Sequence, residues 1–335
     1  MKKNVTMRDI AARLDVSTVT VSKALSNKDG VSEELREKIK EVADSMGYRY
    51  NSLAKGMKEG RSYNVGIIIA ERYVKDDAFY LKMYQSAVKS LAKVNYYGIM
   101  EIISRKTEKD LIMPNMISDN KVDGIIILGQ MNSDYVDIIK EAAIPIVFLD
   151  FYDEHLDVDS IISDNVYGAY ILTNYLISQG HKEIGFIGDI FATSSILDRY
   201  LGYYKALLAN GIHLKEEWII KDRDDAGSFI DIALPKQMPT AFVCNCDEVA
   251  YIFIKQLKKA GFKVPEDVSV VGFDNYIFAN LSSPKLTTIE VDIDNMADTA
   301  VDAVIKKIQE ENFTLGRKVI SGHLIIRDSV SVCTK

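Results

Sequence analysis

The sequence predicts a small all-helical N-terminal domain followed by an α/β core of two lobes, each built on a doubly wound parallel sheet. One observation is a pair of short amphipathic segments within residues 6–25. The second is the region from residue 64 onward, where continuous apolar, β-branched runs alternate with helical segments. Such runs are typical of parallel strands that helices cover on both faces. The chain contains more of these apolar runs than one sheet of ordinary size can hold, so two lobes are expected.

Residues 6–25 fit two short helices joined by a tight turn. Thr6 and Asp9 match a capping box, in which side chains satisfy the backbone N–H groups at a helix start. Asp15 and Val16 interrupt the helical pattern, and Ser17 is a suitable cap for the second helix. A helical hairpin that only packs against the rest of the chain is the alternative that this stretch leaves open.

The second helix is expected to turn small and basic side chains outward. Its apolar residues share one face by helical spacing, which leaves Thr18, Val19, Ser22 and Lys23 on the other face. Hydroxyls can bond phosphates or base edges, a valine can meet a thymine methyl group, and a lysine can reach guanine acceptors. The stretch therefore predicts a helix-turn-helix whose second helix enters the major groove of DNA.

A third helix over residues 32–46 would close this domain, and residues 51–62 then form a short basic linker. A helix from Ser52 to about Lys58 would be marginal in isolation, so we expect it to fold on DNA. Leu53 and Met57 would share one face of it. Two copies in a dimer could pack there and wedge an apolar side chain into the minor groove. A plain flexible linker is the alternative.

Composition narrows the class of protein. The N-terminus has two lysines but no apolar stretch behind them, and no apolar run approaches the roughly 18 residues of a membrane span. Three cysteines cannot build a disulfide framework, so a cytoplasmic location without membrane association is expected. Cys244 and Cys246 form a Cys-x-Cys pair, but no histidine lies near them in the sequence. Neither a metal nor a cofactor is therefore expected.

The formal charge is unevenly distributed. Residues 1–61 hold 13 Lys and Arg against 9 Asp and Glu, whereas residues 62–335 hold 28 against 39. A basic head on an acidic body is what a nucleic-acid-binding protein needs if only the head contacts phosphate.

Several predicted strands end in polar residues, namely Asp150, Asp164, Asn245 with Asp247, and Asp274 with Asn275. In open α/β sheets, ligands bind beyond the carboxyl ends of the strands. Asp and Asn are also ordinary turn and cap residues, so each position alone has a structural alternative. Together they predict a ligand site at these strand ends.

Five segments of the chain resemble the bacterial transcription regulators of the lactose-repressor (LacI/GalR) type. They are TMRDIAARLDVSTVTVSKALSN, VSEELREKIKEVADSMGYRYN, SDNVYGAY with LISQGHKEIGFIG, PTAFVCNCDEVA, and VPEDVSVVGFDN followed by PKLTTIEVD. The resemblance covers nearly the whole chain and implies a periplasmic-binding-protein-like core. It implies a helix-turn-helix domain at 1–50, a hinge at 51–62 and an effector core at 63–335. Lobe 1 would take 63–161 and 293–318, and lobe 2 would take 162–292 and 319–330.

The resemblance also implies which residues contact DNA. These are Thr6, Ser17, Thr18, Val19, Thr20, Ser22, Lys23, Asn51, Leu53 and Met57. Met57 stands where the family usually has an intercalating leucine. Tyr50 replaces a usual proline and Gly56 a common serine, and these departures bear on the helical stability of the hinge.

For the effector, the resemblance implies contacts from Phe79, Tyr80, Asp150, Asp164, Arg199, Cys246 and Asp274. Cys246 replaces the asparagine that many members use as a ligand, and a thiol is a poor hydrogen-bonding partner. Carboxylates, an arginine and aromatic rings suit a polyhydroxylated ligand, because hydroxyls bond carboxylates and sugar C–H faces stack on rings.

The resemblance thus implies a homodimeric, sequence-specific DNA-binding regulator, a repressor, that binds double-stranded operator DNA. A small-molecule effector, a sugar or sugar derivative first of all, would switch its operator affinity. Control by a nucleobase or by a phosphorylated carrier protein is an alternative, as are a transport-type binding protein and a sugar-processing α/β enzyme. The sequence has no Walker loop, no G-x-S-x-G elbow and no convincing pair of catalytic carboxylates, so no enzyme is expected.

Overall fold

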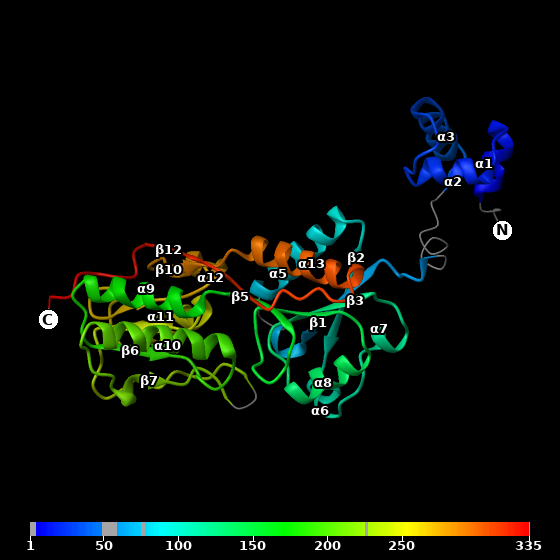
Figure 1. Ribbon diagram of the computed structural model, residues 1–335. Coiled ribbons are helices and arrows are strands. Elements are labelled where there is room, and N and C mark those ends of the chain that lie inside the picture. The colour runs from blue at the N-terminus through cyan, green and yellow to red at the C-terminus, as the bar shows by residue number, and fades with distance from the viewer. Residues whose placement is uncertain (1–4, 49–58, 75–77, 225–226, 335) are drawn as a thin grey trace. The chain divides into compact units, whose positions relative to one another are not determined.

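The computed structural model describes residues 5–48, 59–74, 78–224 and 227–334 (Figure 1). The chain divides into two compact units, Met1–Ser62 and Tyr63–Lys335. Of the residues expected to contact DNA, Asn51, Leu53 and Met57 lie outside the described part of the chain, and so does the expected hinge helix.

The first unit contains three short helices, α1 (Met7–Leu14), α2 (Thr18–Leu25) and α3 (Glu33–Ser45). The predicted capping box is present at α1, where the Thr6 N–H donates to Asp9 Oδ2 at 2.8 Å. Ser17 caps α2 by accepting from the Thr20 N–H at 3.0 Å. The three helices share a small apolar core of Ile10, Ala11, Val21, Ala24, Ile39 and Ala43. This small core holds α2 by one face only.

Arg36 of α3 completes the first unit. Its side chain is buried, and Nη1 donates to the Ala24 carbonyl at 3.2 Å while Nη2 donates to the Lys28 carbonyl at 3.0 Å. These carbonyls lie at and beyond the last turn of α2, where a helix leaves backbone acceptors without internal partners. A cation also suits the negative end of the helix dipole, so Arg36 fixes where α2 ends.

The second unit begins with a six-stranded parallel sheet in the order β11-β5-β4-β3-β1-β2. Its strands are β1 (Asn64–Ala70), β2 (Tyr97–Ile103), β3 (Gly124–Leu128), β4 (Ile146–Leu149), β5 (Asp159–Ser163) and β11 (Arg317–Ile320). The associated helices are η1 (Glu71–Tyr73), α5 (Ala78–Lys93), α6 (Arg105–Lys109), α7 (Asn115–Ser118), α8 (Ser133–Glu141) and α13 (Ile293–Gln309).

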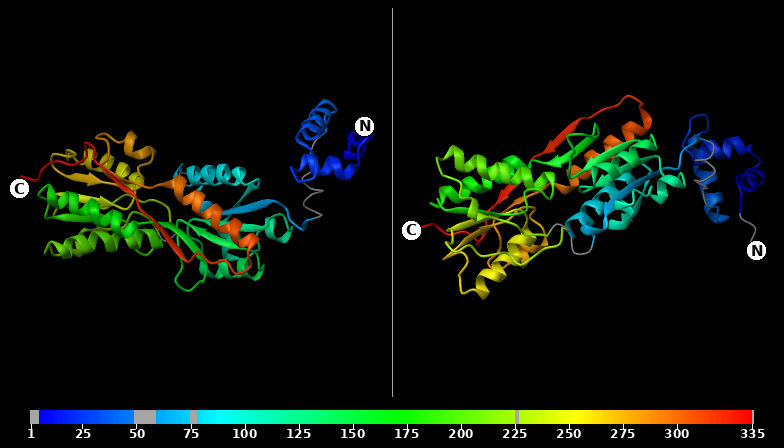
Figure 2. Two further views of the ribbon diagram at one scale, coloured as in Figure 1. Left: turned by 45° about the horizontal axis from the view of Figure 1, so that its top comes forward. Right: turned by 90° about the horizontal axis from the view of Figure 1, so that it is seen from below.

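Helices cover both faces of this sheet, which explains why its strands are apolar throughout. Ile67 packs in the cluster that contains α5 and α13, whereas its neighbour Ile68 packs in the cluster that contains α7 and α8. Successive side chains of a strand point to opposite faces, so both faces require apolar residues. Figure 2 shows α5 and α13 on one side of the sheet.

The other sheet is parallel and four-stranded, in the order β7-β6-β8-β9. Its strands are β6 (Ile184–Ile187), β7 (Ile219–Ile220), β8 (Ala241–Cys244) and β9 (Ser269–Val271). Its helices are α9 (Asn165–Ser178), α10 (Ser194–Ala209), η2 (Glu216–Trp218), α11 (Asp247–Lys259) and α12 (Ile277–Leu281). A short antiparallel pair, β10 (Thr288–Glu290) with β12 (His323–Ile325), lies outside both sheets. The predicted fold class is confirmed.

The chain passes between the two sheets after β5, after β10 and after β11. The first and last of these passages come two residues later than residues 161 and 318, the boundaries expected from the resemblance. The cause is strand pairing, because β5 and β11 run side by side to the Ser163–Ile320 pair. In the described residues, no helix combines the length and apolar character needed to cross a membrane.

Candidate functional site

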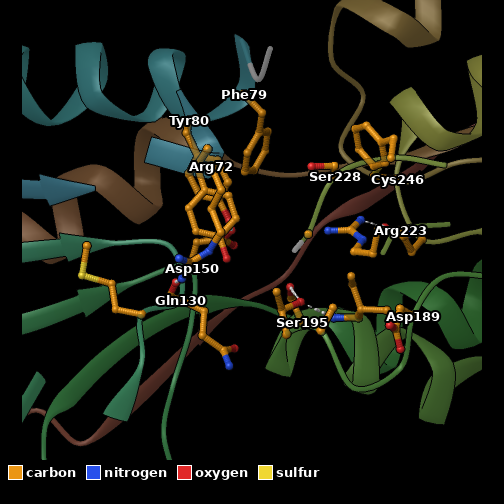
Figure 3. A pocket seen from close by; sticks show the side chains of 18 of the residues that line it. Arg72, Phe79, Tyr80, Gln130, Asp150, Asp189, Ser195, Arg223, Ser228 and Cys246 are labelled. Atoms are coloured by element: carbon orange, nitrogen blue, oxygen red, sulfur yellow. Dashed lines mark hydrogen bonds between the residues drawn. The ribbon is translucent and has the colours of Figure 1, made fainter. Parts of the chain in front are cut away.

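The second unit holds a cleft of about 1360 Å³ at the carboxyl ends of both parallel sheets. The segments that follow β1, β2, β3 and β4 line one wall, and those that follow β6, β7, β8 and β9 line the other. Figure 3 shows Arg72, Tyr80 and Asp150 on one wall and Ser195, Arg223 and Cys246 on the other. The cleft therefore lies where parallel sheets commonly bind ligands.

Six of the seven residues expected to contact an effector line this cleft: Phe79, Tyr80, Asp150, Arg199, Cys246 and Asp274. Asp164 does not line it. Its carboxylate caps α9 by accepting from the Tyr167 N–H at 3.1 Å. The structure thus gives Asp164 the role of an N-cap, which is the commoner use of an aspartate at the end of a strand and start of a helix.

Asp150 follows β4 and is a buried carboxylate of the first wall. Its side chain is only 5% exposed, and its backbone adopts a left-handed conformation with φ of 69°. Oδ2 accepts a 2.9 Å hydrogen bond from the Tyr80 hydroxyl, whereas Oδ1 has no partner among the residues that the structure describes. Burial raises the pKa of Asp150 to about 6, against the opposing effects of the Arg199 charge and the Tyr80 hydrogen bond.

Aromatic rings adjoin Tyr80, which bonds this carboxylate. The Tyr80 ring lies 4.8 Å from the ring of Tyr73 and 5.4 Å from that of Phe79, measured between centroids. Phe79 also meets Tyr276 of the opposite wall edge to face at 6.4 Å. Together the rings form an apolar surface that extends from one wall to the other.

Arg199 of α10 forms the base of the second wall. Its side chain is 5% exposed, and all three nitrogens are engaged. Nε donates to Asn165 Oδ1 at 2.8 Å, Nη1 donates to the Asn245 carbonyl at 2.6 Å, and Nη2 pairs with Asp274 Oδ1 at 3.3 Å. The guanidinium also lies 3.9 Å above the ring of Phe273. Arg199 thus holds the end of β8 and the loop after β9 against α10.

Arg223, which follows β7, lines the cleft and was not expected from the sequence, and neither was its ion-pair partner Asp222. The Asp222 carboxylate is 1% exposed and accepts from Arg223 Nη2 at 2.7 Å, from Asn245 Nδ2 at 2.8 Å and from the Asp189 N–H at 2.8 Å. Burial acts to raise the pKa of Asp222, but the hydrogen bonds and charge of Arg223, together with the hydrogen bonds from Asn245 and the Asp189 N–H, lower it. Arg223 is thereby fixed at the edge of the cleft, with its guanidinium 5.1 Å from the ring of Phe229. In the sequence, the adjacent Asp and Arg were the signal from which this pair could have been predicted.

The remaining cleft residues differ in character. Cys246 precedes α11, and burial raises the pKa of its thiol well above the ordinary range, so the thiol stays protonated. Asp247 is buried and accepts from the Thr288 hydroxyl at 2.7 Å and from the Tyr276 N–H at 3.0 Å. Asp247 positions the loop that carries Asp274.

In the described part of the first unit, the residues expected to contact DNA lie either on α2 or at the cap positions of α1 and α2. Thr18, Val19 and Lys23 of α2 are exposed, with Val19 62% exposed, and Thr20 and Ser22 are half-buried. Thr6 and Ser17 cap α1 and α2. Val19 contributes nothing to the core of this unit, and its exposed side chain is available for contact with another molecule.

The titration of Asp150 can be tested by Asp150→Asn, which keeps an acceptor for Tyr80 and a residue type that tolerates positive φ. Because burial raises the native pKa from 3.8 to about 6, the native state holds the proton more tightly than the unfolded state. The unfolding free energy of the unaltered chain should therefore fall relative to the variant by about 1–3 kcal/mol as pH rises from about 4 to 6.

Urea unfolding of both chains on either side of this window measures the difference. An unfolding free-energy difference that is independent of pH would show that the Asp150 pKa is not raised.

Family models match two parts of the chain. Residues 6–51 match the model described as bacterial regulatory proteins, lacI family, and residues 173–330 match that of a periplasmic binding protein-like domain. Among curated relatives, the NTD biosynthesis operon regulator NtdR of Bacillus subtilis (strain 168) is 31% identical over 335 residues, which cover 97% of this chain and 99% of that protein. The transcriptional repressor CytR of Escherichia coli (strain K12) is 28% identical over 332 residues, which cover 97% of this chain and 96% of that protein.

Solved structures share the fold. The lac repressor dimer bound to operator and the anti-inducer ONPF superposes with a TM-score of 0.77 at 22% identity, covering 98% of this chain and all of that one. The transcriptional regulator CelR in complex with cellobiose gives a TM-score of 0.69 at 23% identity, and the match covers 97% of this chain and 100% of that chain. With a helix-turn-helix unit, a two-sheet core and a relative above 30% identity over nearly its full length, the chain belongs to the lacI family of bacterial regulatory proteins and is a DNA-binding transcriptional regulator with an effector-binding core.

Proposed function

We propose that this regulator acts as a homodimeric repressor that reads its operator with α2, and that a carbohydrate bound in the cleft switches its operator affinity. One observation supports a carbohydrate effector: the facing walls of the cleft combine aromatic rings with fixed hydrogen-bonding groups. Tyr80 and Phe79 offer apolar faces, while Asp150 and Arg223 offer a fixed acceptor and a fixed donor. Pyranose rings have apolar C–H faces and hydroxyls at their edges, which suits such a cleft.

The exposed face of α2 supports the DNA contacts. Lys23 supplies a donor for guanine O6 and N7, Val19 an apolar contact for a thymine methyl group, and Thr18 a hydroxyl for base edges or phosphate. Two copies related by a two-fold axis would place two such helices in successive major grooves. We assign the minor-groove contact to Asn51, Leu53 and Met57 on the basis of the sequence resemblance.

Two solved structures of similar fold support a carbohydrate effector. CelR was solved with cellobiose, and a LacI family regulator from Enterococcus faecium, with a TM-score of 0.66 at 21% identity, was solved with bound ribose. The mechanism we propose is thermodynamic linkage. An effector that binds one conformation of the core more tightly shifts the population toward it, and operator affinity changes by the same coupling free energy.

Replacing Lys23 by Ala tests the DNA contact. Loss of one base contact costs about 1–3 kcal/mol, so operator affinity should fall about 10–100-fold and the base preference at one position should relax. In vitro selection from random duplexes identifies the operator, and titration of the selected duplex measures affinity. Lys38→Ala, which removes an exposed lysine from α3, is the matched control and should lose far less affinity. Equal affinity and equal base preference for Lys23→Ala and the unaltered chain would contradict the assignment.

A thermal-shift screen of the full chain against mono- and disaccharides and nucleosides tests the effector class. A ligand at about 100 times its Kd stabilises the native state by about 2.7 kcal/mol, which gives a measurable rise in Tm. We expect a carbohydrate to raise Tm, and Arg223→Ala to weaken its binding at least about tenfold, since a charged hydrogen bond is lost. Lys236→Ala, which removes an exposed cation away from the cleft, is the control. A rise in Tm with nucleosides alone would contradict the carbohydrate proposal.

A further inference from the structure

Helix α10 carries a second apolar face that does not belong to the core. One face of this helix packs in the core of the second unit. The opposite face exposes three leucines, because Leu197, Leu201 and Leu208 are 38%, 44% and 59% exposed. Tyr204 lies between the last two and is half-buried. A single exposed leucine needs no explanation, but a row of four apolar residues forms a patch of the kind that marks contact with another molecule.

The spacing of this row indicates that its partner is a helix. Intervals of four, three and four residues separate the four members, which we call the α10 seam: Leu197, Leu201, Tyr204 and Leu208. The same alternation separates the a and d positions of a coiled coil, where each apolar side chain inserts between side chains of a facing helix. α10 has 16 residues, so it offers about 24 Å of such a surface.

The surface around the α10 seam is poor in charge. α9, which packs beside α10 (Figure 1), has no charged residue among its 14 residues, although Tyr167 is exposed. Lys205 is the exposed charged residue of α10, and its Nζ lies 5.3 Å from the ring of Tyr170. A helix that is apolar on all sides is normally covered, and the centres of protein interfaces are depleted of charge and rich in tyrosine. The outer face of these two helices therefore has the composition of an interface.

We propose that the α10 seam pairs with the α10 seam of a second copy of this chain, in antiparallel orientation. A two-fold axis through the middle of the helix would place Leu197 opposite Leu208 of the second copy. It would also place Leu201 opposite Tyr204 of the second copy, because the two positions are equally far from the axis. Every residue of the α10 seam then has an apolar partner, so this surface is complementary to itself, as a two-fold contact requires.

Charges at the edge of the α10 seam fit the same orientation. Asp198 and Lys205 are seven residues apart, and each directly follows a residue of the seam. Antiparallel packing brings this edge of one copy against the same edge of the other, with the order reversed. Lys205 of each copy then approaches Asp198 of the other. Because Asp198 is largely buried, this pairing sets the orientation of the contact more than its affinity.

The α10 seam is too small to hold an obligate dimer. Exposed patches of this kind measure roughly a few hundred Å², whereas an interface of standard size buries about 800 Å² on each partner. The contact is therefore weak. This inference rests on the homodimer of the proposed function, because the α10 seam would join two such dimers. Two dimers bound to neighbouring operators would raise the effective concentration of the contact.

The test is sedimentation velocity of the full chain without ligand or DNA, from about 1 to about 100 μM. We expect dimers at the low end and a growing fraction of tetramers at the high end. Leu201→Glu places a charge in the α10 seam and keeps a good helix former, so it should weaken tetramer formation at least about tenfold and leave the dimer intact. Tetramer formation by Leu201→Glu equal to that of the unaltered chain would overturn the inference.

A matched control separates the α10 seam from a general effect of surface charge. Val332 is also an exposed apolar residue, but it lies outside α9 and α10. Val332→Glu should shift the equilibrium between dimer and tetramer by less than about threefold. An effect of Val332→Glu as large as that of Leu201→Glu would overturn the assignment to the α10 seam.

A charge-swap pair tests the antiparallel register. Tyr204→Arg places a guanidinium opposite position 201 of the second copy, and the ring of Tyr200, now stacked on Tyr204, can support it. Each variant alone should form few tetramers. An equal mixture of Leu201→Glu and Tyr204→Arg should recover them, because the two introduced charges meet. A mixture that stays dimeric would overturn the antiparallel pairing.

The masses observed also separate failure of this inference from failure of the proposed function. An unaltered chain that stays dimeric at every concentration would overturn the inference, leave the α10 seam to a helix of another protein and leave the homodimer intact. A monomeric Leu201→Glu would overturn it as well, since the α10 seam would then build the homodimer itself. If the unaltered chain is monomeric at the low end and pairs through the α10 seam at the high end, the homodimer is wrong and the pairing of seams stands.

Discussion

The second wall of the cleft depends on the buried guanidinium of Arg199. A charge so deeply buried is tolerated only when its donors are satisfied and an opposite charge is near. Arg199 meets this requirement through Asn165, the Asn245 carbonyl and Asp274, which come from three different segments. Its position in turn requires α9 and α10 to approach closely. Gly202 permits this approach, because a Cβ there would lie 2.2 Å from the Val166 carbonyl oxygen.

This constraint changes the role expected for Arg199. The resemblance implied a ligand contact, and the residue does line the cleft. All three of its nitrogens nevertheless have protein partners, so removing the side chain would also leave buried polar groups without partners. Arg223 differs in that one buried carboxylate, Asp222, is its main partner, whereas Arg199 joins three segments of the wall.

The fold class followed from sequence because the signals were strong and repeated. Both faces of the first sheet are covered by helices, so its strands had to be apolar throughout, and the cap residues Thr6 and Ser17 behave as local rules predict. The site was harder to predict. Asp164 and Asp150 look alike in sequence, since each ends an apolar strand, but one caps a helix and the other turns into the cleft through a left-handed residue. Asp222 and Arg223 escaped notice because β7 comprises only Ile219 and Ile220, which is too short to produce a periodic pattern.

The proposed function requires that a ligand in the cleft changes the operator affinity of this regulator. The most direct test is to titrate the full chain into operator DNA with and without a saturating concentration of the ligand that raises its Tm. A coupling free energy of about 1–3 kcal/mol predicts a change in operator Kd of about 5–150-fold. An unchanged Kd at a ligand concentration that saturates the cleft would contradict the claim, because the ligand would then bind the two functional states of the protein equally well.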